Sequence, residues 1–208
     1  MTSFSAPEPD FAAKRKYLRE HALKLRQALP AERREALTGQ LVRHLDGLMN
    51  TLAPHSLGFC WPYRAEPDLR AWVQMWLAAA PGRAALLPVV LERHAPMVFR
   101  RWIPGVPMAL DRHGIPHPAE GEALVPEVLL VPLNAFDDRG YRLGYGGGYF
   151  DRTLAGMQTV AVGVGFELGR VADTHPQQYD RPMQWVVTEA GVMKPRATPP
   201  QLPDRNSR

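Results

Sequence analysis

Several short runs of apolar residues show no alternation between apolar and polar positions. The clearest are Ala84 to Val90, Glu127 to Val131 and Thr159 to Phe166. A strand with one face in water alternates, whereas a strand buried on both faces is apolar along its length. The runs therefore predict the inner strands of a mostly parallel sheet with helices covering both faces, which is a layered α/β sandwich.

Segments with helical periodicity lie between these runs. A helix is predicted from Ala12 to about Pro30, with an apolar core stripe formed by Leu18, Leu25 and Leu29. A basic stripe on another face of the same helix is formed by Arg15, Arg19 and Arg26. Further helices are predicted from Ala31, from Leu69 to Leu77 and from Tyr149, and further strands at Ser56 to Trp61, Met97 to Trp102 and Trp185 to Thr188.

The chain has 208 residues, of which 45% are apolar, enough for one hydrophobic core. We expect one domain over residues 12–192, a flexible N-terminus over 1–11 and a proline-rich disordered tail over 193–208. No apolar run approaches the roughly 18 residues of a membrane helix, and no signal peptide pattern opens the chain. The single cysteine, Cys60, predicts a small buried side chain, and we expect a cytoplasmic protein.

Basic residues are concentrated near the N-terminus. Between Lys14 and Asp46 there are nine Lys or Arg and four Asp or Glu. Such an excess favours an anionic ligand, whether a nucleotide, a polyanionic cofactor or nucleic acid. The alternative is a solvated helical face.

The segment from Val131 to Arg152 leaves a buried strand, turns twice and enters a helix. It contains four glycines within five positions, namely Gly144, Gly146, Gly147 and Gly148. Glycine lets the backbone approach a ligand closely, and a following helix N-terminus favours phosphate. Arg142 adds a forked cationic donor and Asp151 an oxygen ligand for magnesium. The segment predicts a nucleoside triphosphate site, with a structural turn as the alternative because the ending of a P-loop is missing.

The chain resembles the 5-formyltetrahydrofolate cyclo-ligases, also called methenyltetrahydrofolate synthetases, in the string from Arg142 to Asp151, which follows Phe136-Asp137. The resemblance extends to Leu18-Arg19, Glu66, the segment from Gly114 to Pro118, and the segment from Tyr179 to Pro182 before Val186 to Glu189. It covers roughly residues 12–192, in family order.

Family members close 5-formyltetrahydrofolate to 5,10-methenyltetrahydrofolate, consuming ATP and needing magnesium. The resemblance implies the same activity here, with a reduced folate and ATP as partners, ADP and phosphate as products, and no nucleic acid or membrane partner. A monomer or weak dimer is expected. Because the formyl oxygen is a poor leaving group, it would first be phosphorylated by the γ-phosphate, and arginines, backbone amides and a metal would dominate the site.

The resemblance also implies the ATP site. The residues expected to bind ATP are Arg15, Arg19, Arg142, Leu143, Gly144, Tyr145, Gly146, Gly147, Gly148, Tyr149 and Phe150, and those expected to act in catalysis are Arg142 and Tyr149. The family commonly has lysine at the positions of Arg15 and Gly147. Arg15 keeps the charge, whereas the loop cation is missing and Arg15 or Arg152 is the candidate replacement.

The remaining implied residues hold magnesium and folate. Asp151 and Asp180 would bind magnesium, and the folate would contact Trp61, Glu66, Tyr145 and Tyr149, with Phe59 and Tyr63 as weaker candidates. Glu66 would accept hydrogen bonds from the pterin. Taken without the resemblance, Glu66 indicates a solvated loop residue and Asp180 a turn residue.

Two other functions compete with the cyclo-ligase. One is a catalytically idle relative that binds a nucleotide, folate or RNA, favoured by the basic first helix and a pI near 9.5. The other is a ligase acting on a different formamide or carboxylate. Retention of Glu66, Arg142, Asp151 and Asp180 together favours the cyclo-ligase over an idle binder.

Overall fold

The computed structural model describes residues 10–195, so most of the predicted flexible N-terminus and of the predicted tail lies outside the described residues. Helix α1 (Phe11–Gln27) begins at an N-cap, since Asp10 Oδ1 accepts a hydrogen bond of 2.9 Å from the amide of Ala13. At the other end, strand β12 (Gly191–Met193) carries the fold one residue beyond the predicted boundary.

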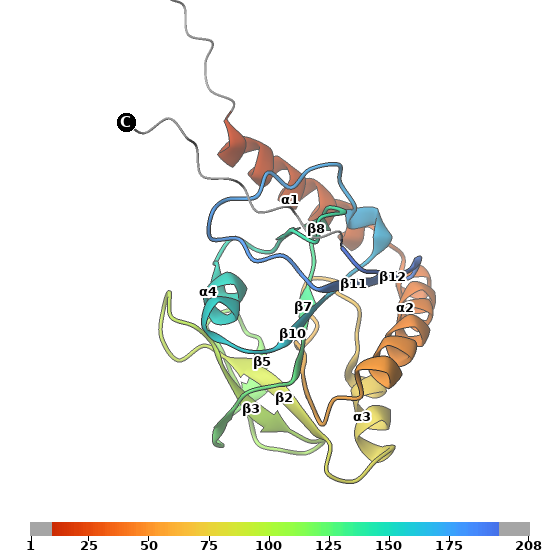
Figure 1. The fold of residues 1–208 in the computed structure, drawn as a ribbon, viewed down its shortest axis with the longest axis vertical. Helices are drawn as coiled ribbons and strands as arrows, with labels where there is room; N and C mark the ends of the chain where they lie inside the picture. The colour runs from red at the N-terminus through yellow and green to blue at the C-terminus, as the bar shows by residue number, and fades with distance from the viewer. Residues whose placement is uncertain (1–9, 196–208) are drawn as a thin grey trace, which may run out of the picture.

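An eight-stranded sheet forms the centre of the molecule, in the order β12-β11-β10-β7-β1-β2-β3-β6 (Figure 1). Its other strands are β1 (Ser56–Gly58), β2 (Ala84–Val89), β3 (Val98–Trp102), β6 (Ala123–Leu124), β7 (Val128–Pro132), β10 (Val160–Val164) and β11 (Trp185–Thr188). The strands from β11 to β2 pair in parallel, and β12, β3 and β6 join antiparallel at the edges. The predicted mostly parallel sheet is confirmed.

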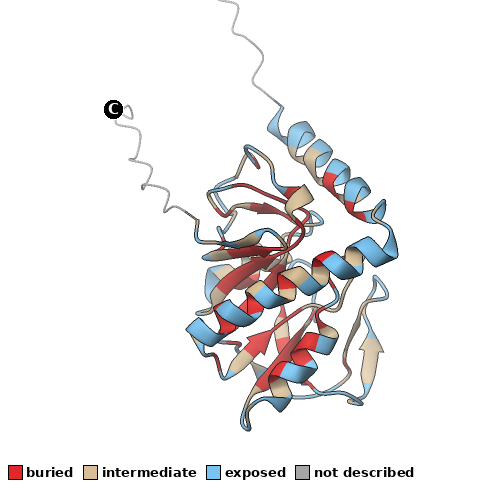
Figure 2. Ribbon diagram, turned by 90° about the vertical axis from the view of Figure 1, so that its right-hand side faces the viewer, coloured by how far each residue is buried: buried red, intermediate tan, exposed pale blue. Residues whose placement is uncertain are grey.

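Helices cover both faces of this sheet. In β7, Val128 and Leu130 belong to the core cluster that includes α2 (Ala31–Leu52) and α3 (Arg70–Ala78), while Leu129 and Val131 belong to the cluster against which α4 (Tyr149–Gly156) packs. Figure 2 shows buried strands behind α2, whose outer face is exposed. Because both faces of β7 are covered, its sequence is apolar without alternation.

Helix α1 packs differently from the prediction. It lies against the hairpin of β8 (Ala135–Phe136) and β9 (Arg142–Leu143). Its buried residues are Ala22 and Arg26, whereas Leu25 is 41% exposed, so the predicted place of Leu25 in the core is wrong. The hairpin side presents carbonyl groups, and the guanidinium of Arg26 donates to the carbonyl of Leu133 at 3.1 Å. Arg26 is thus buried on the inner face of the helix, where Leu18 also packs.

The hairpin of β4 (Met108–Leu110) and β5 (Pro116–Pro118) was not predicted, because its prolines and lack of alternation hide the strands. The short helix η1 (Glu167–Gly169) follows β10. Two predicted strands are shorter than expected, since Ser56 to Trp61 ends at Gly58 and Thr159 to Phe166 ends at Val164.

The connections diverge at the middle of the sheet. From β1 the chain passes through α3 to β2 on one side, and from β7 it passes through α4 to β10 on the other. Since β1 and β7 are neighbours, the loops after these two strands separate and leave a crevice at the carboxyl edge of the sheet. This is where the sequence places the glycine-rich segment and Glu66.

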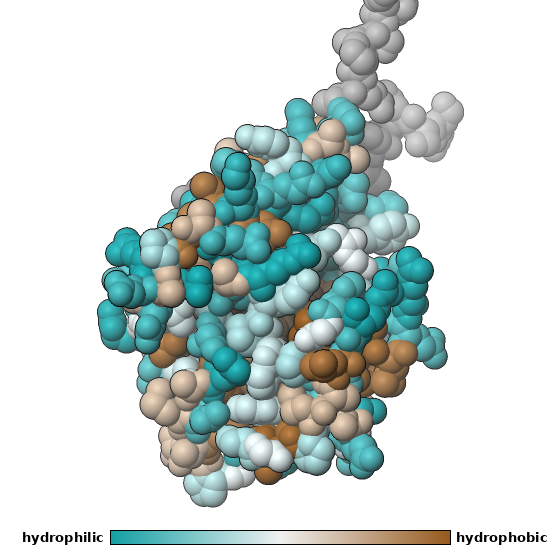
Figure 3. Space-filling view, turned by 180° about the vertical axis from the view of Figure 1, so that it is seen from behind, coloured by the Kyte–Doolittle hydropathy of each residue, from teal (hydrophilic) through white to brown (hydrophobic). Residues whose placement is uncertain are grey.

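The surface in Figure 3 is mainly hydrophilic, and its hydrophobic groups form separate patches. Over residues 10–195, the model contains no helix that is both long and apolar enough to span a bilayer.

Candidate active site

A cavity of about 950 Å³ opens at this crevice, at the upper end of the size range of small-molecule sites. The structure brings most of the predicted site residues to its wall. These are Arg15, Arg19, Trp61, Glu66, Arg142, Gly144, Tyr145, Gly146, Gly147, Gly148, Tyr149, Phe150, Asp151 and Asp180.

Two of the predicted residues lie elsewhere. Leu143 is 1% exposed and packs with Ala22 and Ala135 beneath α1, so its side chain does not face the cavity. Phe59 is fully buried in the core below α2 and α3, with its ring edge-on to Trp102 at 5.2 Å between centroids. Both side chains support the walls of the cavity from behind.

The glycine loop, residues 144–148, lies between β9 and α4. Gly146 and Gly148 have φ angles of +91° and +66°, which glycine adopts at little cost. At Gly147, a Cβ atom would lie 2.9 Å from the ring of Tyr149, so glycine also lets that ring fold back on the loop. Gly148 is the N-cap of α4 and brings no capping side chain in the described structure. The loop and the first turn of α4 therefore leave backbone amides available to an anion.

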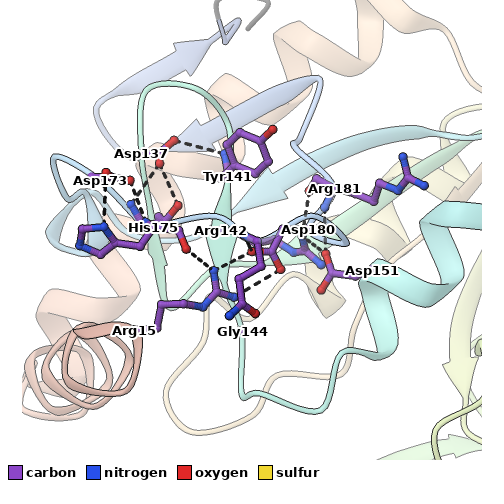
Figure 4. A network of polar contacts seen from close by, with 12 residues as sticks. Arg15, Asp137, Tyr141, Arg142, Gly144, Asp151, Asp173, His175, Asp180 and Arg181 are labelled. Atoms are coloured by element: carbon purple, nitrogen blue, oxygen red, sulfur yellow. Dashed lines mark hydrogen bonds and ion pairs between the residues drawn. The ribbon is translucent and has the colours of Figure 1, made fainter. Parts of the chain in front are cut away.

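Arginines of α1 face this loop. Arg15 donates to Asp180 Oδ2 at 2.6 Å and to the carbonyl of His175 at 2.9 Å (Figure 4). Arg19 donates from Nε to the carbonyl of Gly144 at 2.8 Å. Burial and the neighbouring charge of Arg15 lower the pKa of Arg19. The positive charges of these two side chains at the cavity wall favour an anionic ligand.

Arg142 is held from two sides at the start of the loop. Its Nη1 donates to Asp151 Oδ1 and to the carbonyl of Arg181, both at 3.0 Å, and the side chain is 4% exposed. The amide of Arg181 in turn donates to Asp151 Oδ1 at 3.1 Å. Figure 4 shows these groups converging from β9, α4 and the segment before β11. The guanidinium is thus preorganised at the cavity wall.

The two predicted magnesium ligands differ in how far they are already occupied. Asp151 uses Oδ1 for Arg142 and Arg181, and its Oδ2 accepts no hydrogen bond from residues 10–195. Asp180 uses both oxygens, for Arg15 and for the amide of Gln177, and its own amide closes a turn onto Gln177. The described residues hold no group of three or more His, Cys, Asp or Glu that could bind a metal. Magnesium commonly takes one or two carboxylates and completes its shell with phosphates and water, which fits Asp151.

Glu66 belongs to the segment after β1. It is only 7% exposed, so the alternative that Glu66 is a solvated loop residue is wrong. Its Oε1 accepts from the hydroxyl of Tyr145 at 2.8 Å, its Oε2 accepts from the amide of Tyr63 at 3.0 Å, and Arg26 lies 3.9 Å away. Burial raises the pKa of Glu66 in spite of these partners. Each oxygen keeps a lone pair for a ligand.

Apolar residues continue the wall beside Glu66. Trp61 packs edge-on to Trp102 with centroids 6.4 Å apart, and the guanidinium of Arg70 lies 4.7 Å from its ring centre. Cys60 also lines the cavity, half-buried, with Sγ 4.0 Å from the carbonyl of Leu130. Desolvation, with Glu66 as the second cause, raises the pKa of this thiol, which makes it unreactive. This part of the cavity suits a flat, partly apolar ligand.

Several site residues were missed by sequence reasoning. Arg26 joins Glu66, although the sequence marked it only as part of a basic stripe. The β4–β5 hairpin brings His113 and His117 to the cavity. His117 Nδ1 lies 3.0 Å from the carbonyl of Pro118. The resemblance included the segment from Gly114 to Pro118, but no place in the site was predicted for it.

Comparisons with known proteins agree with this geometry. The model of the 5-formyltetrahydrofolate cyclo-ligase family matches residues 11–189. A 5-formyltetrahydrofolate cyclo-ligase of Haemophilus influenzae is 27% identical, covering 82% of this chain and 95% of the relative, and one of Mycolicibacterium smegmatis is 34% identical, covering 70% and 79%. The solved structure of Aquifex aeolicus 5,10-methenyltetrahydrofolate synthetase superposes with a TM-score of 0.77 at 26% identity, covering 93% of this chain and 99% of that one.

Proposed function

Because the chain belongs to the 5-formyltetrahydrofolate cyclo-ligase family, we propose that it uses ATP to close 5-formyltetrahydrofolate to 5,10-methenyltetrahydrofolate, with release of ADP and phosphate. One observation carries the proposal. A single cavity has a glycine loop with arginines on one side and the buried carboxylate of Glu66 on the other. Such a cavity can hold a triphosphate and a pterin side by side.

The reaction needs activation of a formamide oxygen. In the proposed course, that oxygen attacks the γ-phosphorus and ADP leaves. The 10-nitrogen then attacks the formyl carbon and loses its proton, the C–O bond breaks, and the oxygen departs as part of inorganic phosphate, which can take up that proton. Both steps move negative charge among phosphate oxygens, so stabilisation by fixed cations and amides accounts for most of the catalysis.

The nucleotide would lie against the glycine loop. The amides of residues 144–148 and the first turn of α4 would hold the phosphates, and Arg19 faces the loop at Gly144. Arg142 is fixed by Asp151 at the end of β9 and would stabilise the transferring phosphoryl group without moving. Tyr149, at the start of α4, would border both ligands.

Bound magnesium would neutralise charge on the phosphates. Of the two predicted ligands, Asp151 is the one with an oxygen, Oδ2, that accepts no hydrogen bond from the described residues, so we propose that it holds the metal. Asp180 would also bind the metal once Arg15 leaves Asp180 and pairs with the phosphates instead.

The folate would occupy the other half of the cavity. Glu66 would accept hydrogen bonds from the pterin amino and ring NH groups, and the ring would lie against Trp61. The buried, charged carboxylate needs donors to offset its desolvation, and the pterin supplies them.

A direct assay tests the proposal. Purified protein is mixed with 5-formyltetrahydrofolate, ATP and magnesium, and the absorbance of the methenyl product is followed, with each component omitted in turn. An increase that requires all three supports the proposal. ATP binding without product would favour the idle binding module or another substrate.

We expect Glu66→Gln to raise the KM for 5-formyltetrahydrofolate by about 10- to 100-fold, the value of one hydrogen bond to a charged group, and to change the KM for ATP by less than about threefold. Glutamine keeps an oxygen for Tyr145 but loses the charge that would bind the pterin. Steady-state kinetics with each substrate varied in turn measures both constants. Glu32→Gln, which changes an exposed residue of α2, is the matched control.

The pH dependence gives a second measurement of the same carboxylate. Because the pKa of Glu66 is raised, the wild-type KM for folate should increase on acidification before ordinary glutamates titrate, and Glu66→Gln should lack this step. The raised pKa of Glu66 affects protein stability in the opposite direction from folate binding. The stability that protonation of Glu66 contributes is fully present below its unfolded pKa and is lost as pH rises through its folded pKa. An equal loss of affinity for both substrates in Glu66→Gln would contradict the pterin role.

A further inference from the structure

Tyr145 occupies a position between two buried charges. Its hydroxyl lies 2.6 Å from Arg26 Nη2 and 2.8 Å from Glu66 Oε1. Arg26 is 2% exposed and Glu66 is 7% exposed. Arg26 and Glu66 are themselves 3.9 Å apart, so much of their contact passes through the tyrosine oxygen.

The direction of these hydrogen bonds follows from the groups involved. A guanidinium has donors and no acceptor, so the tyrosine oxygen accepts from Arg26. The single hydroxyl proton is therefore directed to the carboxylate of Glu66. Burial, and then the charge of Glu66, raise the pKa of Tyr145, so the proton stays on the hydroxyl. The bond between Tyr145 and Glu66 therefore needs an accepting oxygen of Glu66 held in a fixed orientation.

The ring of Tyr145 is also held, although it is 40% exposed. It packs edge-on to Tyr63 with centroids 5.4 Å apart, and the guanidinium of Arg64 lies 5.9 Å from its centre. Tyr63 and Arg64 belong to the segment after β1 that carries Glu66. The tyrosine thus joins the glycine loop to this segment through both its ring and its hydroxyl.

Other contacts of the loop run in different directions. Gly144 is held by Arg19 of α1, and the carbonyl of Gly147 accepts from Arg152 Nη2 of α4 at 2.5 Å. Arg152 Nε is buried and has no hydrogen-bond partner within the described chain. Among the described contacts of residues 144–148, those of the Tyr145 hydroxyl join the loop to the segment after β1. The hydroxyl donates to Glu66 at 2.8 Å, and the carbonyl of Tyr63 lies 3.4 Å away.

We propose that Tyr145 is a positioning residue that couples the two halves of the cavity, so that a folate on Glu66 and a nucleotide on the glycine loop each strengthen the binding of the other. This inference rests on the proposed function. A pterin bound to Glu66 holds the carboxylate in the orientation that Tyr145 needs, and Tyr145 then holds the loop for the phosphates. Such coupling is reciprocal, because it is a free energy shared by both sites.

The test measures binding of each ligand in the presence and absence of the other. Titration calorimetry gives the Kd of 5-formyltetrahydrofolate with and without adenylyl imidodiphosphate and magnesium, a nucleotide that does not transfer its phosphate. We expect the wild-type Kd to fall by about 5- to 10-fold when the nucleotide is present, the value of one hydrogen bond. In Tyr145→Phe, which keeps the ring, the nucleotide should lower the Kd of 5-formyltetrahydrofolate by less than about twofold. The Kd of the nucleotide should change by the same factors.

Controls separate coupling from a loosened structure. Tyr141→Phe makes the same substitution four residues earlier, at a side chain that does not line the cavity. It should keep the wild-type factor. A merely structural role for Tyr145 would weaken each ligand measured alone and leave the factor intact, which would overturn the proposal. Failure of the proposed function would appear in the wild type, as absence of both turnover and folate binding, and would overturn the coupling as well.

Discussion

Asp151→Asn is expected to lower kcat by about 100- to 1,000-fold, and also to reduce stability, because it removes the counter-charge of the buried Arg142. Asparagine keeps the oxygen that accepts from Arg142 and Arg181, but it removes the negative charge that fixes Arg142 and would hold magnesium. Arg142 is 6% exposed, so the lost charge is not replaced by solvent. The measurement is kcat at saturating substrates over a magnesium titration.

Asp138→Asn is the matched control for this variant. Asp138 pairs with Arg170 on the surface, and its side chain is 79% exposed and lies outside the cavity. It should keep wild-type kcat. If Asp151→Asn retained normal turnover and magnesium dependence, Asp151 would have no role in the metal site.

Asp137→Ala is expected to reduce the free energy of unfolding by about 3 to 5 kcal/mol, because it leaves at least two buried donors without an acceptor. Asp137 is fully buried. Its Oδ2 accepts from the amide of Thr174 at 3.1 Å and from the hydroxyl of Thr174 at 2.8 Å. Its Oδ1 accepts from the amide of Arg139 at 3.0 Å. Urea unfolding of the wild type and of Asp137→Ala measures the difference in their free energies of unfolding.

The same carboxylate joins two parts of the site. It ties the β8–β9 hairpin, which leads into the glycine loop, to the segment that carries His175 and Asp180, the partners of Arg15. We therefore expect the KM for ATP to rise together with the loss of stability. Asp173→Ala removes the exposed second partner of Arg139 and should cost less than about 1 kcal/mol. Equal losses in the two variants would show that burial of Asp137 does not matter.

Much of the fold could be predicted from local patterns. The inner strands and the helices α2, α3 and α4 were expected near where they lie. An unbroken apolar run indicates a strand buried on both faces, and helical periodicity indicates a helix buried on one face. The hairpin β4–β5 was missed because Pro116 and Pro118 break the usual strand pattern. Leu25 was misplaced because the side of α1 that packs inward is decided by Arg26, whose carbonyl partners at Leu133 and Arg64 are far along the chain.

The site followed the same division. The glycine loop, Arg142 and Asp151 lie within a short stretch, so the sequence by itself predicts a phosphate site there. It also marked Glu66 through resemblance. The tertiary structure alone decided that Arg26, Glu66 and Tyr145 meet in one contact, since they come from three segments that are brought together at the crevice beyond the parallel strands β1 and β7. Residue spacing records the neighbours along one element, whereas contacts between distant elements depend on how the elements pack.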